Sequence, residues 1–259
     1  WIHLADPHDH YTPPPVYRSL YSEDEPGLIK PVQTSRKPLL KHLDGRNISP
    51  ENLSRMIDLY DGEIRYVDDM MGEFILNLEK MGLLDNTIII FTADHGEEFM
   101  DHGKLYHGRT MYEEQIHVPL VIYVPGIKPD TVKEKTRHID LYPTLMDLTG
   151  IKQPQGLKGI VVGAGETREV FSETDFHDHH QSALILGDEK VIHDWNTNQT
   201  TLYNLKEDPD EQEGRILSQM EAKPYIDSIK KYRKNPYTPG GKAEISEETL
   251  QALRDAGYL

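Results

Sequence analysis

The clearest feature in the pattern of apolar positions along the chain is a β-branched run that stops abruptly. Thr87 to Thr92 read Thr-Ile-Ile-Ile-Phe-Thr, and Asp94-His95-Gly96 follow closely. A continuous apolar run of this length predicts a buried parallel strand that delivers polar side chains to the edge of a sheet. Val118 to Val124 predicts a second buried strand, which Pro125-Gly126 ends.

The segment from Ser49 to Leu84 predicts the longest helix. Ser49 suits the N-cap and Pro50 the first helical position, and apolar residues then recur at steps of three and four until Gly82 ends the pattern. Asp68 and Asp69 within this helix predict a solvated face rather than a metal pair, because neighbouring helix positions diverge by about 100 degrees.

The pattern changes near Gly156. Before it, Ile139 to Thr149 predicts a helix that Gly150 ends. After it, turn residues separate short strands that predict an antiparallel meander followed by a helix. These elements are expected at Glu169–Ser172, Ala183–Leu186, Lys190–Asp194 and Thr200–Leu205, with the helix near Ala222–Tyr232. Ile2 to Ala5 predicts a short strand, and Val16 to Asn47 a long surface excursion.

Composition excludes several classes of protein. The 259 residues are 37% hydrophobic, enough for a sizeable core, and no apolar run approaches the roughly 18 residues that span a bilayer. A formal net charge of −16 argues against general nucleic-acid binding, which needs a cationic surface. The absence of Cys excludes disulfides and thiolate ligands. Such a charge repels anionic ligands unless a bound cation and nearby imidazole and guanidinium groups reverse the local field.

Side chains that could bind a metal or transfer a proton follow the strand predicted at Thr87–Thr92. Asp94 and His95 offer an oxygen and a nitrogen donor at a strand end, where open α/β sheets place their ligands. His102 and His107 follow in the next loop. A metal site is one interpretation. Taken alone, so short an Asp-His-Gly match is more typical of a solvated turn.

Six segments extend this pattern over most of the chain. They are Trp1–Pro14, Tyr60–Thr87, Asn86–Gly126, His138–Ile151, Leu202–Glu211 and Leu250–Leu259. In this order they resemble the sulfatase family of the alkaline phosphatase superfamily. The resemblance implies an α/β fold: part of a mainly parallel sheet sandwiched by helices, with a small antiparallel α+β C-terminal subdomain. It implies that residues 1–156 are the C-terminal half of the catalytic domain and residues 157–259 the subdomain.

The same resemblance implies a sulfuric ester hydrolase that acts on a sulfated small molecule or glycan. Asp94 and His95 would supply ligands to a divalent metal. Calcium is the usual family ion, and manganese is plausible because His95 replaces a common Asn with a nitrogen donor. His8 corresponds to the family His that contacts the sulfate and the leaving-group oxygen, with His10 in place of the family's second Pro. His107 stands where many sulfatases have Lys, and an imidazole suits general acid work.

One family element has no counterpart in this chain. Sulfatases attack the ester with a formylglycine made from Cys or Ser in a Cys/Ser-x-Pro-x-Arg motif, and the sequence holds no Cys and no such Ser. The paired aspartates that complete the family metal shell have no match either. We therefore expect a C-terminal portion of a longer enzyme, with formylglycine in a preceding region, and neither turnover nor tight metal binding by the chain alone.

Other functions and locations stay open at this point. The superfamily scaffold also supports phosphonate or phosphate ester hydrolysis, and a catalytically silent fragment or a glycan-binding module is a further alternative. No signal peptide is visible, and the family resemblance favours a periplasmic or secreted location.

Several histidines have weaker interpretations. His102 is either a partner of the metal cluster or a packing residue, and His117 is expected to pair with the backbone or with Glu113. The run from Asp175 to His180 is dense in metal-type ligands but matches no family metal motif, and it predicts a solvated turn.

Overall fold

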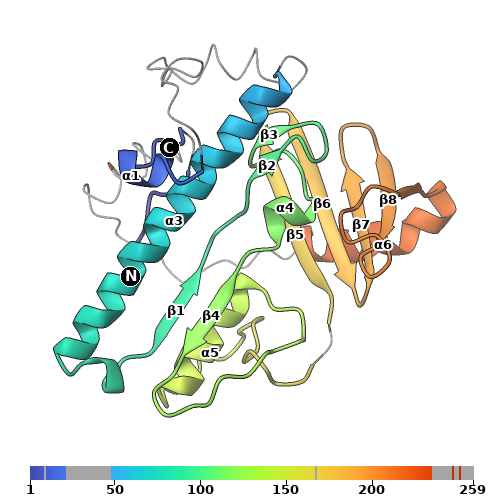
Figure 1. The fold of residues 1–259 in the computed structure, drawn as a ribbon. Coiled ribbons are helices and arrows are strands. Elements are labelled where there is room, and N and C mark those ends of the chain that lie inside the picture. Colours follow the sequence, from blue (N-terminus) through green and yellow to red (C-terminus); the bar gives the residue numbers. More distant parts are fainter. Residues whose placement is uncertain (9, 22–47, 167, 235–246, 248–250, 252–259) are drawn as a thin grey trace. The chain divides into compact units, whose positions relative to one another are not determined.

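The computed structural model of the chain, drawn in Figure 1, describes residues 1–8, 10–21, 48–166, 168–234, 247 and 251. The chain divides into two units. The first comprises Trp1–His42, Asn47–Leu78 and Lys234–Leu259, and the second Leu43–Arg46 and Glu79–Arg233. None of the helices in the described part of the chain combines the length and apolar character that a bilayer span needs.

Helix α3, Pro50–Lys80, dominates the first unit and confirms the longest predicted helix. Ser49 caps it, because its Oγ accepts a hydrogen bond from the backbone N–H of Asn52 at 3.2 Å. Gly82 follows the end with a φ of 68° and donates its N–H to the Glu79 carbonyl, so a left-handed residue stops the helix as predicted.

The N-terminal segment of this unit differs from the prediction. Ile2 to Ala5 form no strand, and Ile2 is 63% exposed, because no described strand of this unit pairs with them. Helix α1, Pro15–Arg18, begins the predicted surface excursion. Residues 22–47 of that excursion lie outside the described residues.

The two strands predicted as buried, the first of them also as parallel, have a different environment in the second unit. Strands β1, Ile89–Thr92, and β4, Leu120–Tyr123, pair antiparallel with each other. Val121 is 59% exposed on β4. Burial fails because each strand has a single partner among the described strands, so one side of the ladder stays uncovered. Every ladder that the structure describes is antiparallel.

Two short helices and two short strands complete this part of the unit. Strands β2, Glu98–Phe99, and β3, Leu105–Tyr106, form a small ladder, and helix α4, Glu113–Ile116, follows. The 3-10 turns η1 and η2 are Leu84–Asn86 and His138–Asp140. Helix α5, Leu141–Leu148, continues from η2 and confirms the predicted helix, with Gly150 at φ 68° after its end.

The predicted C-terminal meander is confirmed and has one more strand than expected. Its order is β5-β6-β7-β8-β9, with each strand antiparallel to the next. The bounds are Val170–Phe176, His179–Leu186, Glu189–Asp194, Gln199–Asn204 and Arg215–Ile216. Helix α6, Gln219–Lys234, follows it and runs behind the sheet in Figure 1.

Both faces of this sheet are covered, because side chains alternate along each strand. Leu184 and Val191 pack on one face with Ile229 of α6. Ala183 and Ile192 point to the other face and pack with Met111, which leads into α4. The sheet is therefore joined through its second face to the loop that carries the candidate chemistry.

Candidate active site

The loop after β1 is fixed at both sides. The Thr92 hydroxyl donates to the Pro119 carbonyl at 2.8 Å, and His138 Nε2 donates to the Ala93 carbonyl at 2.8 Å. Gly96 donates its N–H to the Gln115 carbonyl, and a Cβ at Gly96 would lie 2.0 Å from the carbonyl oxygen of the neighbouring Glu114. Only glycine permits this approach, so the Asp-His-Gly motif packs directly on α4.

Asp94 and His95 present the donor set predicted for a metal. The His95 N–H donates to Asp94 Oδ1 at 3.1 Å, which turns the carboxylate back over the loop. His95 Nδ1 lies 2.9 Å from the Gly96 carbonyl, so Nδ1 carries the proton and Nε2 is the acceptor nitrogen. Nε2 lies 3.8 Å from Asp94 Oδ2. Both atoms can reach one cation with bonds of about 2.0–2.5 Å, so the residues fit a divalent metal.

His107 lies against this pair. Its ring stacks on the ring of His95 with centroids 4.0 Å apart and an angle of 27°. Its Nδ1 donates to the carboxylate of Glu97 at 3.2 Å, and that carboxylate is only 5% exposed. A carboxylate on Nδ1 fixes the ring orientation and leaves Nε2 for exchange with a ligand. The second unit thus brings together three of the residues proposed from sequence.

A buried carboxylate organises the loop between these residues. Glu98 is fully buried, and its two oxygens accept bonds from the backbone of Lys104, from the Thr110 hydroxyl and from the Gln115 amide. The side-chain oxygen Oε1 of Gln115 then accepts the N–H of Gly108, the residue after His107. Sequence reasoning missed Glu97, Glu98 and Gln115. For Glu97 and Glu98 the only signal was two adjacent acids directly after the glycine of the motif, and Gln115 gave no signal.

The β5–β6 hairpin supports the same loop from the sheet. The Thr174 hydroxyl donates to the Gly108 carbonyl at 2.6 Å. Gly108 has a φ of 82°, and a Cβ there would lie 3.3 Å from the Phe176 ring. The run from Asp175 to His180 therefore turns beside the His107 loop, and its Asp175 and His180 pair across the ladder.

His102 and His117 take structural positions. His102 stacks on Tyr112 at 3.5 Å, and its Nδ1 lies 2.7 Å from the Glu114 carboxylate. Burial lowers the pKa of His102, but the bond and charge of Glu114 outweigh it, so the net direction is upward. His117 has a side chain 78% exposed and pairs with Glu113 at 3.6 Å, as predicted.

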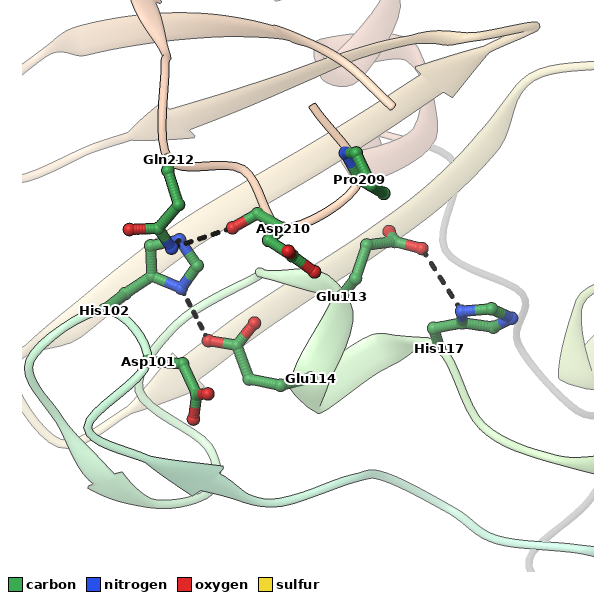
Figure 2. A pocket seen from close by; sticks show the side chains of 8 residues that line it. All are labelled: Asp101, His102, Glu113, Glu114, His117, Pro209, Asp210 and Gln212. Carbon is green, nitrogen blue, oxygen red and sulfur yellow. Dashed lines mark hydrogen bonds and ion pairs between the residues drawn. The ribbon is translucent and has the colours of Figure 1, made fainter. Parts of the chain in front are cut away.

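A pocket of about 770 Å³ lies beside α4, and Figure 2 shows its lining. The lining residues are Asp101, His102, Glu113, Glu114, His117, Pro209, Asp210 and Gln212. Four of these side chains are carboxylates, so the pocket repels an anionic ester. The stacked His95 and His107 are not among its lining residues.

His8 belongs to the first unit, where its backbone N–H donates to Glu63 of α3 at 3.3 Å. Its neighbour His10 is exposed. Their roles at the site stay predictions.

Comparisons with known proteins agree with the motifs. The family model described as Sulfatase matches residues 1–151, and one described as N-sulphoglucosamine sulphohydrolase, C-terminal, matches residues 101–235. Arylsulfatase K of Bos taurus is 38% identical over 135 residues, which cover 52% of this chain and 24% of that protein. The chain thus spans about a quarter of the length of this curated relative.

Solved structures show the same fold. A 2-O GAG sulfatase has a TM-score of 0.62 at 22% identity, with 74% of this chain and 44% of that chain covered. Phosphonate monoester hydrolase of Agrobacterium radiobacter has a TM-score of 0.54 at 25% identity, with 80% and 42% covered. The fold is therefore alkaline phosphatase-like with an antiparallel C-terminal sheet. Since the Sulfatase model matches more than half of the chain, the chain belongs to the sulfatase family.

Proposed function

We propose that the protein to which this chain belongs hydrolyses sulfate esters of a sulfated small molecule or glycan, and that the chain supplies part of its metal site and the group that assists the leaving oxygen. The observation that carries this proposal is the arrangement around His107. Its imidazole is fixed by Glu97 on one nitrogen and stacked on His95, next to Asp94.

Asp94 and His95 would hold a divalent metal, calcium or manganese, through a carboxylate oxygen and an imidazole nitrogen 3.8 Å apart. When bound, the metal offsets negative charge on the sulfuryl oxygens and activates the nucleophile. The Gly96 contacts keep both donors at a fixed place on the loop, so little reorganisation is needed on binding.

His107 would donate a proton to the departing alkoxide. The Glu97 carboxylate holds Nδ1–H, which leaves Nε2 as the nitrogen that gives up the proton. Charge develops on the leaving oxygen only as the ester bond breaks, so this interaction favours the transition state over bound substrate. By its motif, His8 would contact the sulfate and the same leaving oxygen.

A second candidate is phosphonate or phosphate ester hydrolysis. The likeness to a phosphonate monoester hydrolase at 25% identity favours it, and a metal beside an imidazole suits either kind of ester.

The experiment compares the two ester classes in the full-length protein. We expect kcat/KM to be higher for an aryl sulfate than for the matched aryl phosphonate. We also expect His107→Ala to lower sulfate turnover and the exposed control His117→Ala to leave it unchanged. Higher turnover of the phosphonate would establish the second candidate instead, and equal loss in both variants would reject the role of His107.

A further inference from the structure

Glu63 lies in the middle of α3 and is 1% exposed. Its Oε1 accepts a hydrogen bond from the backbone N–H of Thr12 at 2.5 Å, and its Oε2 accepts one from the backbone N–H of His8 at 3.3 Å. The two oxygens of one carboxylate therefore bind the backbone N–H groups of His8 and Thr12.

The surrounding contacts dock this segment on a single turn of the helix. The ring of Tyr11 meets the edge of Tyr60 at 5.5 Å. A Cβ at Gly62 would lie 3.0 Å from Pro13, so glycine gives the proline room to pack against the helix. Pro13 is buried there. Glu63 adds the polar contacts to an otherwise apolar and aromatic interface.

The choice of a carboxylate at this position is specific. Two N–H groups point at the Glu63 carboxyl group. Only an ionised carboxylate can accept a hydrogen bond on both of its oxygens, whereas an amide offers one acceptor and one NH₂ donor. The described residues place no cation in an ion pair with Glu63. Keeping a buried charge without such a partner is costly, so the two backbone bonds are the main compensation.

We propose that Glu63 is the positioning residue for His8: its ionised carboxylate accepts the backbone N–H groups of His8 and Thr12 and so orients the His8 imidazole for the leaving-group role, an inference that rests on the proposed function. Protonation converts one carboxyl oxygen into an O–H donor that faces an N–H donor. One of the two bonds is then lost, and with it one of the two contacts that orient His8.

The charges around Glu63 place this change near neutral pH. Burial raises the pKa of Glu63 to about 7, the bonds from Thr12 and His8 oppose this, and the negative charge of Asp6 adds to it. The imidazole of His8 acts in the opposite direction when it is charged. Ionisation of Glu63 in this range therefore completes the pair of backbone bonds that orients His8.

The first test follows the backbone amide of Thr12 by NMR in the full chain between pH 5 and 9. We expect its proton shift to titrate with a midpoint near 7, because the amide senses the charge of its acceptor. Glu63→Gln should abolish this titration, and Glu79→Gln, an exposed residue on the same helix, should leave it unchanged. Asp6→Asn should move the midpoint to lower pH by removing a like charge. A flat Thr12 shift, or the same titration in Glu63→Gln, would overturn the proposal.

The second test uses sulfate turnover by the full-length protein. We expect kcat to rise with pH through about 7 in the wild type and this limb to flatten in Glu63→Gln, with KM little changed. An unchanged pH profile in Glu63→Gln, in a variant shown to be folded under the assay conditions, would also overturn the proposal. If the protein hydrolyses no sulfate ester, the proposed function fails, while the Thr12 titration still decides whether Glu63 holds the segment.

Discussion

At the scale of single residues, the proposed chemistry rests on a cluster of polar groups at the end of β1. His95 contacts both neighbours in this cluster, because its Nε2 lies 3.8 Å from Asp94 Oδ2 and its ring stacks on His107. A positive charge bound at the first pair would therefore lie next to the proposed proton donor. Under the proposed function, charge stabilisation and proton transfer would both belong to this one loop.

Removing one of the two donors should weaken metal binding. In the chain alone we expect Asp94→Ala to reduce calcium affinity at least about tenfold. Calcium takes about six to eight oxygen ligands, and this substitution removes the carboxylate that supplies oxygen to the site. Calorimetric titration measures this, with exposed Asp85→Ala as the matched control. The wild-type chain should itself bind weakly, so submicromolar affinity would show that donors beyond Asp94 and His95 contribute.

The sequence predicted some of these residues and not others, for a physical reason. Asp94, His95 and His107 lie in a motif whose residue types are typical of metal ligands and general acids. Glu97, Glu98 and Gln115 act by which backbone groups they meet in space, and only the folded loop determines that. In the sequence alone, Glu98, whose carboxylate accepts bonds from Lys104, Thr110 and Gln115, cannot be told from an acid on a solvated turn.

At the scale of elements, local patterns predicted α3, α5 and the C-terminal meander, because capping residues and alternation act within a few neighbours. The pairing of β1 with β4 depends on distant segments, and the expectation of buried parallel strands was wrong there. The mainly parallel sheet of the family fold stays a prediction beyond the described ladders.

The contact between the Asp-His-Gly loop and α4 should tolerate no side chain at position 96. Gly96→Ala would place a Cβ 2.0 Å from the Glu114 carbonyl, so we expect a loss of at least about 2 kcal/mol in the free energy of unfolding. Gly72→Ala is the matched control, because a Cβ there meets nothing within 4 Å inside α3. It should stabilise the protein by about 0.5–1 kcal/mol. Denaturant unfolding of both variants decides, and equal effects would contradict the account.

A buried ion cluster joins α4 to the C-terminal sheet. Lys190 of β7 is fully buried and lies 2.9 Å from Glu113 and 2.8 Å from Glu211. Burial raises the pKa of Glu211, and the charge of Lys190 opposes this. Lys190→Met would leave two carboxylates without their cation, and we expect a cost of about 3–5 kcal/mol in unfolding experiments.

The exposed pair between Lys223 and Asp227 provides the comparison, since both side chains are more than half exposed. Lys223→Met should cost less than about 1 kcal/mol. A cost for Lys190→Met as small as that of the exposed pair would mean that the cluster does not hold α4 on the sheet.

At the scale of the whole molecule, Glu63 links stability to pH. Its folded pKa of about 7 lies above the ordinary value of 4.5, so between these values the folded state binds more protons than the unfolded state. Stability therefore falls as pH rises through this window. Relative to Glu63→Gln, the wild type should lose up to about 3 kcal/mol between pH 4.5 and pH 7.5.

Thermal melting of the two proteins at both pH values measures this difference, and other titrating groups cancel in the comparison. A constant difference in melting temperature across the range would show that Glu63 has the same charge in the folded and unfolded states.

The net charge of −16 gives the molecule a field that opposes anionic substrates, and the site has to reverse it locally. In this account the reversal comes from a cation at Asp94 and His95 and from the proton of His107. The central claim is that His107 delivers this proton to the leaving oxygen of a sulfate ester.

The direct measurement is kcat/KM of the full-length protein and of His107→Ala across aryl sulfates of graded leaving-group acidity. For poor leaving groups we expect His107→Ala to reduce the rate about 100-fold to 10,000-fold, as is usual for a positioned acid. For nitrophenyl sulfates the reduction should shrink, because these groups depart without a proton. The same reduction for good and poor leaving groups would contradict the role of His107 as the acid.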